Sequence, residues 1–251
     1  MTALMYHDVV AAGAEDSSGF PGRDAALYKI TPVLFAEHLR AIGPSPDVVL
    51  TFDDGGAAAL TAADILESHG FTGHFFVTTN YVGARGFLDD RGIRDLDRRG
   101  HTIGSHSCSH PLRMGRCAWP RLLEEWTGSR HALEDLLGRE VRTASVPGGD
   151  FAPQVAEAAA RAGFTRLFTS EPIAESRHAF GLTLSGRFTI RRWTTAATAA
   201  ALVNGAWLPR VRQAVVWNAK KFGKRVGGDR YLQLRRLLLG HRHDVRWGDQ
   251  L

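Results

Sequence analysis

Two neighbouring carboxylates, Asp53 and Asp54, are the first residues in this sequence whose types and spacing could do chemistry. They follow the apolar run at 48–50, which predicts a strand buried on both faces, as in parallel sheets. Catalytic groups collect at the carboxyl ends of such strands. Adjacent carboxylates in a cleft repel each other, so both stay ionised only beside a cation, or else one carries a proton. Asp-Asp-Gly is also ordinary turn chemistry, and a simple turn is the alternative interpretation.

A pair of histidines, His106 and His110, forms the second candidate group and follows a short predicted strand at 101–105. Four residues apart on a helical turn, they would lie on one face and could share a metal ion. Neutral imidazole suits zinc and similar ions, although two solvent-facing polar side chains would give the same pattern. Cys108 is a soft ligand type, but in a helical turn it would point away from both histidines, and we leave it out of the site.

Two further polar segments follow predicted strands in the same way. His7 comes directly after a strand at 3–6, and Pro147-Gly148 comes after a strand at 141–146. The carboxyl ends of alternating βα strands meet on one face of a sheet, so all four segments are predicted to form one site. One aspartate and two histidines make a three-ligand metal set with a position left for water, and the other aspartate could be the general base. Alone, the Pro-Gly-Gly stretch would be interpreted as a simple loop.

The elements that must position these residues alternate along the chain. Besides the strands above, apolar runs predict strands at 73–78, 166–169 and 188–191, and capped apolar periodicity predicts helices at 31–43, 61–69, 89–99, 119–137 and 152–162. With about seven strands between helices, the pattern predicts a parallel α/β barrel or open sheet in one domain. A chain of 251 residues, 44% hydrophobic, is long enough for such a domain.

Charge divides the chain into two predicted parts, a domain at 1–204 and a basic helical tail at 205–251. The tail holds eleven Lys and Arg against three Asp, whereas the remainder is slightly acidic. From Trp207 to Leu239, apolar and basic residues alternate as in a helix lying on an anionic membrane, which predicts peripheral membrane association. A solvated helix packed on the barrel is the alternative. Nucleic-acid binding is not expected, because no nucleic-acid motif accompanies the charge.

The N-terminus and the cysteines indicate the compartment. The first residues show neither a basic region nor a long apolar stretch, so no export signal is predicted and we expect a cytoplasmic protein. The sequence has two cysteines, Cys108 and Cys117, whose spacing fits neither a disulfide framework nor a zinc knuckle. We expect both to be free thiols.

Segments 51–55 and 100–110 resemble the first two motifs of the polysaccharide deacetylases of carbohydrate esterase family four. The resemblance spans about residues 3–191. It implies a distorted (β/α) barrel. It also implies an enzyme that uses a divalent metal, usually zinc, to remove an acetyl group from an N-acetylated sugar. By position it also implies that Asp53 is the base and that the metal ligands are Asp54, His106 and His110.

Two departures from the family pattern bear on the site. The third motif should begin with an arginine that pairs with the catalytic aspartate, but Ser145 stands there. The family's histidine acid normally lies near the C-terminus, whereas here the segment ending at His7 fits that motif. This resembles the circularly permuted members that deacetylate poly-N-acetylglucosamine, and it implies that His7 is the acid. Pro147 and Gly148 lie in the third motif and would bind substrate and the oxyanion.

The resemblance therefore implies metal-assisted amide hydrolysis. Without an export signal, the substrate is expected to be a cytoplasmic N-acetylated sugar, free, nucleotide-linked or carried on a lipid at the inner membrane face. The alternative from another class is a metal- and sugar-binding protein without turnover that acts through its basic tail. The missing arginine favours that alternative, whereas the presence of His7 and Asp53 together opposes it.

Overall fold

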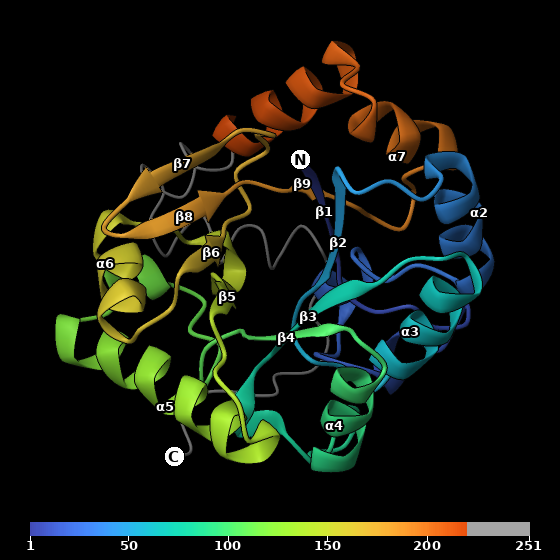
Figure 1. Cartoon of the computed structure of the whole chain (residues 1–251). Helices are drawn as coiled ribbons and strands as arrows, with labels where there is room; N and C mark the ends of the chain where they lie inside the picture. Colours follow the sequence, from blue (N-terminus) through green and yellow to red (C-terminus); the bar gives the residue numbers. More distant parts are fainter. Residues whose placement is uncertain (220–251) are drawn as a thin grey trace.

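A curled sheet of nine strands, with helices around its outer side, forms the centre of the computed structural model, which describes residues 1–219 (Figure 1). The strand order is β7-β8-β6-β5-β4-β3-β2-β1-β9. In chain order the strands are β1 (Thr2–Tyr6), β2 (Val48–Phe52), β3 (Gly73–Val77), β4 (Thr102–Ser105), β5 (Thr143–Ser145), β6 (Arg166–Phe168), β7 (Ser176–Ala179), β8 (Leu182–Ser185) and β9 (Phe188–Thr189).

All neighbouring strands pair in parallel except β7 and β8, which form an antiparallel hairpin. The predicted distorted (β/α) barrel is thus confirmed, with two strands more than the predicted seven. The additional strands are β7 and β8. Residues Ser176–Ala179 are largely polar and exposed, so their sequence lacks the apolar run from which buried strands are predicted.

The helices cover the outer face of the sheet, and all but the last of them lie between two strands along the chain (Figure 1). They are α1 (Arg23–Ala26), α2 (Pro32–Ile42), α3 (Ala59–Ser68), α4 (Asp90–Arg98), α5 (Trp119–Leu137), α6 (Pro153–Arg161) and α7 (Ala196–Val203). Their ends follow the sequence signals: Thr31 and Asp89 cap α2 and α4 with side-chain oxygens, and Gly138 ends α5 in a left-handed conformation. One continuous apolar core fills the space between helices and strands.

The inner side of the curled sheet has a different character. Its apolar cluster is small, with Ala3, Phe76 and Phe168 buried together. Toward the carboxyl ends of the strands the buried side chains become polar, with Thr51 on β2 and Ser145 on β5 both fully buried. Side chains alternate between the two faces of a strand. The polar side chains on the inner face therefore adjoin the residues that follow each strand.

A helix at 207–219 lies beside the edge strand β9 and is fastened to it by side chains. The Gln213 amide accepts from the Thr189 N–H at 2.9 Å and donates to its carbonyl at 3.0 Å. The Arg210 guanidinium stacks on Phe188 and donates to the Leu202 carbonyl. These bonds occupy polar groups that an edge strand would otherwise leave open.

The rest of the predicted basic tail, including Lys220, Lys221, Lys224 and the segment 229–239, lies outside the described residues. Within residues 1–219, no helix combines the length and apolar character needed to cross a membrane. Cys108 and Cys117 are both free thiols, as predicted.

Candidate active site

The two adjacent carboxylates follow β2 and point to different partners. Asp53 continues the strand direction, and its backbone N–H donates to the Tyr6 carbonyl on β1. Asp54 has a positive φ of 78°, a conformation that non-glycine residues adopt rarely, and Gly55 follows with a φ of 80°. A Cβ on Gly55 would lie 3.1 Å from the Val77 backbone, so the turn fits tightly against β3. The turn separates the two side chains, which lets each take a separate role.

Asp54 lies against both predicted histidines. Its Oδ1 atom is 3.4 Å from Nε2 of His106 and 3.4 Å from Nε2 of His110. The three potential ligand atoms all lie within 4.8 Å of one another. Two imidazole nitrogens and a carboxylate oxygen are the donor set typical of catalytic zinc sites, so these residues fit a divalent metal.

The electrostatics and hydrogen bonds of this cluster suit metal binding. Burial alone would raise the pKa of Asp54, but the bonds to His106 and His110 hold it well below the usual value. The Nδ1 atom of His106 lies 3.0 Å from the Ser145 carbonyl. A proton on Nδ1 leaves Nε2 free to ligate, and such a partner also fixes the orientation of the ring.

The histidines do not lie on a helical turn, and that part of the prediction was wrong. Residues 106–110 form a loop in which Ser107 and His110 have positive φ values of 67° and 56°. Serine hydroxyls hold the loop: Ser107 Oγ accepts from the His110 N–H at 3.1 Å, and Ser105 Oγ accepts from the Ser107 N–H at 3.0 Å. The loop brings the rings to a centroid distance of 5.1 Å.

Helix α5 supports this loop through Glu125, a buried carboxylate that accepts from the Ser109 N–H at 2.9 Å. Cys108 points toward α5, where its thiol contacts the Glu124 carbonyl. It lies outside the ligand cluster, as the sequence indicated, although the reason is loop geometry and not helical spacing.

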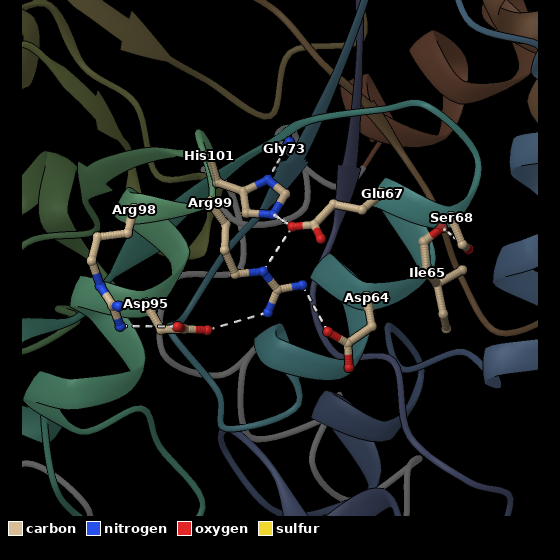
Figure 2. Close-up of polar contacts among 9 residues, drawn as sticks. All are labelled: Asp64, Ile65, Glu67, Ser68, Gly73, Asp95, Arg98, Arg99 and His101. Atoms are coloured by element: carbon tan, nitrogen blue, oxygen red, sulfur yellow. Dashed lines mark hydrogen bonds and ion pairs between the residues drawn. The ribbon is translucent and has the colours of Figure 1, made fainter.

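The first histidine of the same motif, His101, has a structural position. Figure 2 shows its ring between the Gly73 N–H, which donates to Nδ1 at 3.1 Å, and Glu67, whose Oε1 lies 3.0 Å from Nε2. Arg99 joins the same network by pairing with Asp64 and Glu67 on α3 (Figure 2). Burial lowers the pKa of His101, which favours the neutral ring that these two bonds require. The network ties α3 and α4 to the start of β3.

Asp53 is held by an arginine that the sequence analysis missed. Nη1 and Nη2 of Arg187, in the turn between β8 and β9, donate to the two Asp53 carboxylate oxygens at 2.7 and 2.8 Å. Both side chains are almost fully buried. Burial alone would raise the pKa of Asp53, but the charge of Arg187 outweighs it, and the pKa lies below its usual value. Asp53 is therefore ionised at neutral pH.

Ser145 completes this group at the position where an arginine was expected. Its hydroxyl lies 3.2 Å from Asp53 Oδ1 and accepts from Arg187 at 2.7 Å. Arg187 also donates to the Thr169 carbonyl, and its guanidinium lies over the rings of Phe76 and Phe168. A short serine on β5 leaves room for an arginine from the β8–β9 turn, so the carboxylate still has a cationic partner.

His7 leaves β1 beside these carboxylates. A charge on its ring would lower the pKa values of both Asp53 and Asp54, which places it in the same electrostatic site. The ring packs against Tyr28 with a centroid distance of 4.9 Å. Its Nδ1 atom is buried without a hydrogen-bond partner among the residues that the structure describes.

A loop at 9–30 closes one side of the site through a second buried ion pair that sequence reasoning missed. Lys29 lies 3.7 Å from Asp8 and donates to the Glu15, Ser18 and Phe20 carbonyls. Burial raises the pKa of Asp8, with Lys29 opposing that effect. The fixed loop places the Phe20 ring 4.7 Å from the His110 ring.

Pro147 and Gly148 lie where predicted, in a short turn directly after β5. Gly148 has a φ of 60°, and a Cβ there would lie 3.3 Å from the Leu112 carbonyl. The turn thus packs against the segment that follows His110. The structure therefore brings all the sequence-predicted site residues to the carboxyl ends of β1, β2, β4 and β5.

Comparison with protein families gives a match to the model of the polysaccharide deacetylase family over residues 41–167. Among curated proteins, a putative polysaccharide deacetylase of Bacillus subtilis, YxkH, is 24% identical over 52% of this chain and 47% of its own length. The peptidoglycan-N-acetylmuramic acid deacetylase PdaA of the same organism is 29% identical over 49% of this chain and 46% of its own. The chain spans about half the length of these relatives.

Solved structures show the same fold. A polysaccharide deacetylase from Bacillus cereus has a TM-score of 0.67 at 17% identity, covering 80% of this chain and 68% of that one. IcaB from Ammonifex degensii has a TM-score of 0.65 at 20% identity, covering 80% of this chain and 96% of that one. The deacetylase PplD of Streptococcus pyogenes has a TM-score of 0.65 at 20% identity, covering 78% of this chain and 95% of that one. At these identities the likeness concerns the fold alone.

Proposed function

Because this chain belongs to the polysaccharide deacetylase family, we propose that it is a metal-dependent hydrolase that removes the acetyl group from an N-acetylated sugar or glycan. The observation that carries the proposal is that two groups of residues lie next to each other at the carboxyl ends of the strands. A three-ligand cluster of Asp54, His106 and His110 adjoins a carboxylate, Asp53, that Arg187 keeps ionised. A binding protein would not require both.

Each group of residues would have a separate role in the reaction. Asp54, His106 and His110 hold a divalent metal, which we take to be Zn²⁺ from the donor set, and which when bound supplies Lewis-acid activation of the acetyl group and water.

Asp53 accepts a proton from the attacking water, since its carboxylate is ionised and oriented by Arg187. His7 donates a proton to the leaving amine nitrogen. Pro147 and Gly148 would border the substrate, and the Gly148 N–H would donate to the developing oxyanion. His7 fills this role in the manner proposed for circularly permuted members of the family.

Acetate release from N-acetylated sugars by metal-loaded protein tests the proposal. A useful panel contains free, nucleotide-linked and lipid-linked N-acetylated sugars, with protein treated with a chelator as the control. Release that depends on the metal supports the proposal, whereas a well-folded, metal-loaded protein that releases acetate from none of them contradicts it.

The alternative, a sugar-binding protein without turnover, was favoured by the missing family arginine. Arg187 supplies the cation from the β8–β9 turn, so this argument no longer holds. The full set of proposed base, acid and ligands instead favours catalysis.

We also propose that the protein acts at the inner membrane face on a lipid-linked sugar. In support, the helix at 207–219 keeps Arg210 and Gln213 toward the barrel and exposes Trp207, Leu208, Val211 and Val215. Exposed apolar side chains followed by basic residues are typical of an interfacial helix. Within the chain's sequence, three lysines follow at 220–224.

Sedimentation with anionic and neutral vesicles tests this location. Replacing Leu208 and Val211 with Gln should reduce recovery with anionic vesicles, whereas Val33→Gln should not, although Val33 on α2 is 68% exposed. Equal recovery with both lipids, or no effect of deleting 207–251, would contradict the membrane proposal and leave the deacetylase proposal intact.

A further inference from the structure

The segment that follows β9 carries a cation that the proposed reaction does not use. Arg191 lies two residues beyond Thr189, and its guanidinium lies over two aromatic rings, at 6.0 Å from the Tyr28 centroid and 5.6 Å from the Trp193 centroid. Within residues 1–219, this guanidinium has neither a carboxylate partner nor a hydrogen-bond acceptor. A half-buried arginine normally finds one, because its five N–H groups prefer carboxylate or phosphate oxygens.

The position of Arg191 is fixed by the backbone around it. The Ile190 N–H donates to the Met5 carbonyl at 2.9 Å, which continues the pairing of β9 with β1 toward His7. The Arg192 N–H donates to the Leu27 carbonyl at 3.0 Å and holds the segment against the loop that carries Tyr28. Thr194 closes a turn by accepting from the Arg191 N–H at 3.0 Å. The backbone that carries the Arg191 side chain is thus fixed before and after this residue.

This cation lies close to the proposed acid, His7, through a ring that both contact. Tyr28 packs against His7 and also lies under Arg191, so one ring contacts both the proposed acid and the free guanidinium. Phe188 and Ile190 are buried in the core, and strand alternation therefore turns Thr189 and Arg191 to the inner side, as it does Arg187. Trp193, the second ring beside this guanidinium, is 57% exposed.

We propose that Arg191, with Tyr28 and Trp193, binds an anionic group that the substrate carries beside its N-acetylated sugar. The inference rests on the proposed deacetylase function and narrows its substrate class. A guanidinium offers two parallel N–H groups to a phosphate or a carboxylate, and a neutral polymer would leave them unpaired. The aromatic rings exclude water from the guanidinium, which strengthens its bond to an anion. The substrate is therefore an amino sugar bearing a phosphate or a carboxylate.

Binding of reaction products tests the inference without turnover. Calorimetry on metal-loaded protein would compare glucosamine 1-phosphate and muramic acid with methyl glucosaminide, which carries the same amine but no acidic group. We expect one of the two acidic sugars to bind about 10- to 100-fold more tightly than methyl glucosaminide, the range for a hydrogen bond to a charged group. Tighter binding of glucosamine 1-phosphate would indicate a site for a phosphate, and tighter binding of muramic acid would indicate a site for a carboxylate.

Arg191→Gln should abolish the preference for the acidic sugar and leave binding of methyl glucosaminide unchanged. Arg192→Gln is the matched control, because Arg192 is the adjacent arginine and already lies 3.6 Å from Glu15. An unchanged thermal unfolding midpoint would show that both variants are folded. In acetate release from N-acetylglucosamine 1-phosphate and N-acetylmuramic acid, Arg191→Gln should raise KM for the preferred substrate about 10- to 100-fold with little change in kcat.

The outcomes separate this inference from the function on which it rests. Equal binding of the acidic sugars and methyl glucosaminide by the wild type, or equal effects of the Arg191 and Arg192 variants, would overturn the inference while acetate release continues. Arg191-dependent binding of a charged sugar, without acetate release from any substrate, would support the anion site and contradict the deacetylase function.

Discussion

The proposed metal cluster and the proposed base site are neighbours in space but are built in different ways. The cluster uses residues from two short sequence segments, with His106 and His110 only four residues apart. The base site joins Asp53 to Ser145 and Arg187, which are 92 and 134 residues away in the chain. A local pattern can therefore reveal the first site, whereas the second appears only when the sheet has curled and brought β2, β5 and the β8–β9 turn together.

The largest expected effect is at the metal cluster. His106→Ala and His110→Ala should each lose bound metal and with it all measurable acetate release, because two ligands leave too weak a site. Metal analysis after dialysis measures the first effect directly. His101→Ala is the control: it lies in the same motif but contacts Glu67 and Gly73, so it should keep the metal even if stability falls. Full metal content in both cluster variants would refute the ligand assignment.

Replacing His7 should act on turnover alone. His7→Ala removes the proposed acid but no ligand, so we expect about a 10²–10⁴-fold loss in kcat at unchanged metal content. His69→Ala, at the end of α3, serves as a control and should be unaffected. A near-normal rate for His7→Ala across the pH range would mean that the acid is another group.

Arg187 should matter for both stability and pH dependence. Arg187→Met leaves Asp53 buried without its cation, which typically costs about 3–5 kcal/mol in the free energy of unfolding. Urea denaturation measures this, with Arg177→Met as the control, since its exposed pair with Glu171 should contribute less than about 1 kcal/mol.

The pH dependence follows from the sign of the shift at Asp53. Its pKa in the folded protein lies below the unfolded value of 3.8, so its stabilising contribution is present above that pH and is lost on further acidification. Without the positive charge of Arg187, the effect of burial is less opposed, and the pKa of Asp53 rises. The acid limb of activity and the acid-unfolding midpoint should both move to higher pH in Arg187→Met, and unchanged profiles would contradict the pairing.

The smallest expected effect is at Ser145. Ser145→Ala removes one hydroxyl partner from Asp53 and from Arg187 but leaves their two direct bonds, so we expect a loss of about 1 kcal/mol in the free energy of unfolding. Activity should fall modestly. A loss as large as that of Arg187→Met would show that the serine, and not the arginine, orients the base.

The barrel and most of its helices could be predicted because apolar runs and caps are local signals. Helix α5 was predicted with its observed bounds, Trp119–Leu137. The β7–β8 hairpin was missed because its outer strand is polar and exposed. The residues after each strand could be assigned to one site from the alternation alone.

The missed parts of the site depend on long-range contacts. Lys29 lies in a loop without periodicity, and only its burial beside Asp8 shows its role. Arg187 stands between Gly186 and a very short strand, where an arginine carries no distinctive signal. The histidine pair was found with incorrect local geometry, since side-chain hydrogen bonds and positive φ values override the helical spacing.

The most direct test of the account is Asp53→Asn, measured for metal content and acetate release on the same sample. Because Asp53 contacts Arg187 and Ser145 and lies outside the ligand cluster, the account predicts full metal content with turnover reduced by at least about 10²-fold. Turnover near the wild-type rate, or loss of the metal together with activity, would contradict the division of roles between Asp53 and Asp54.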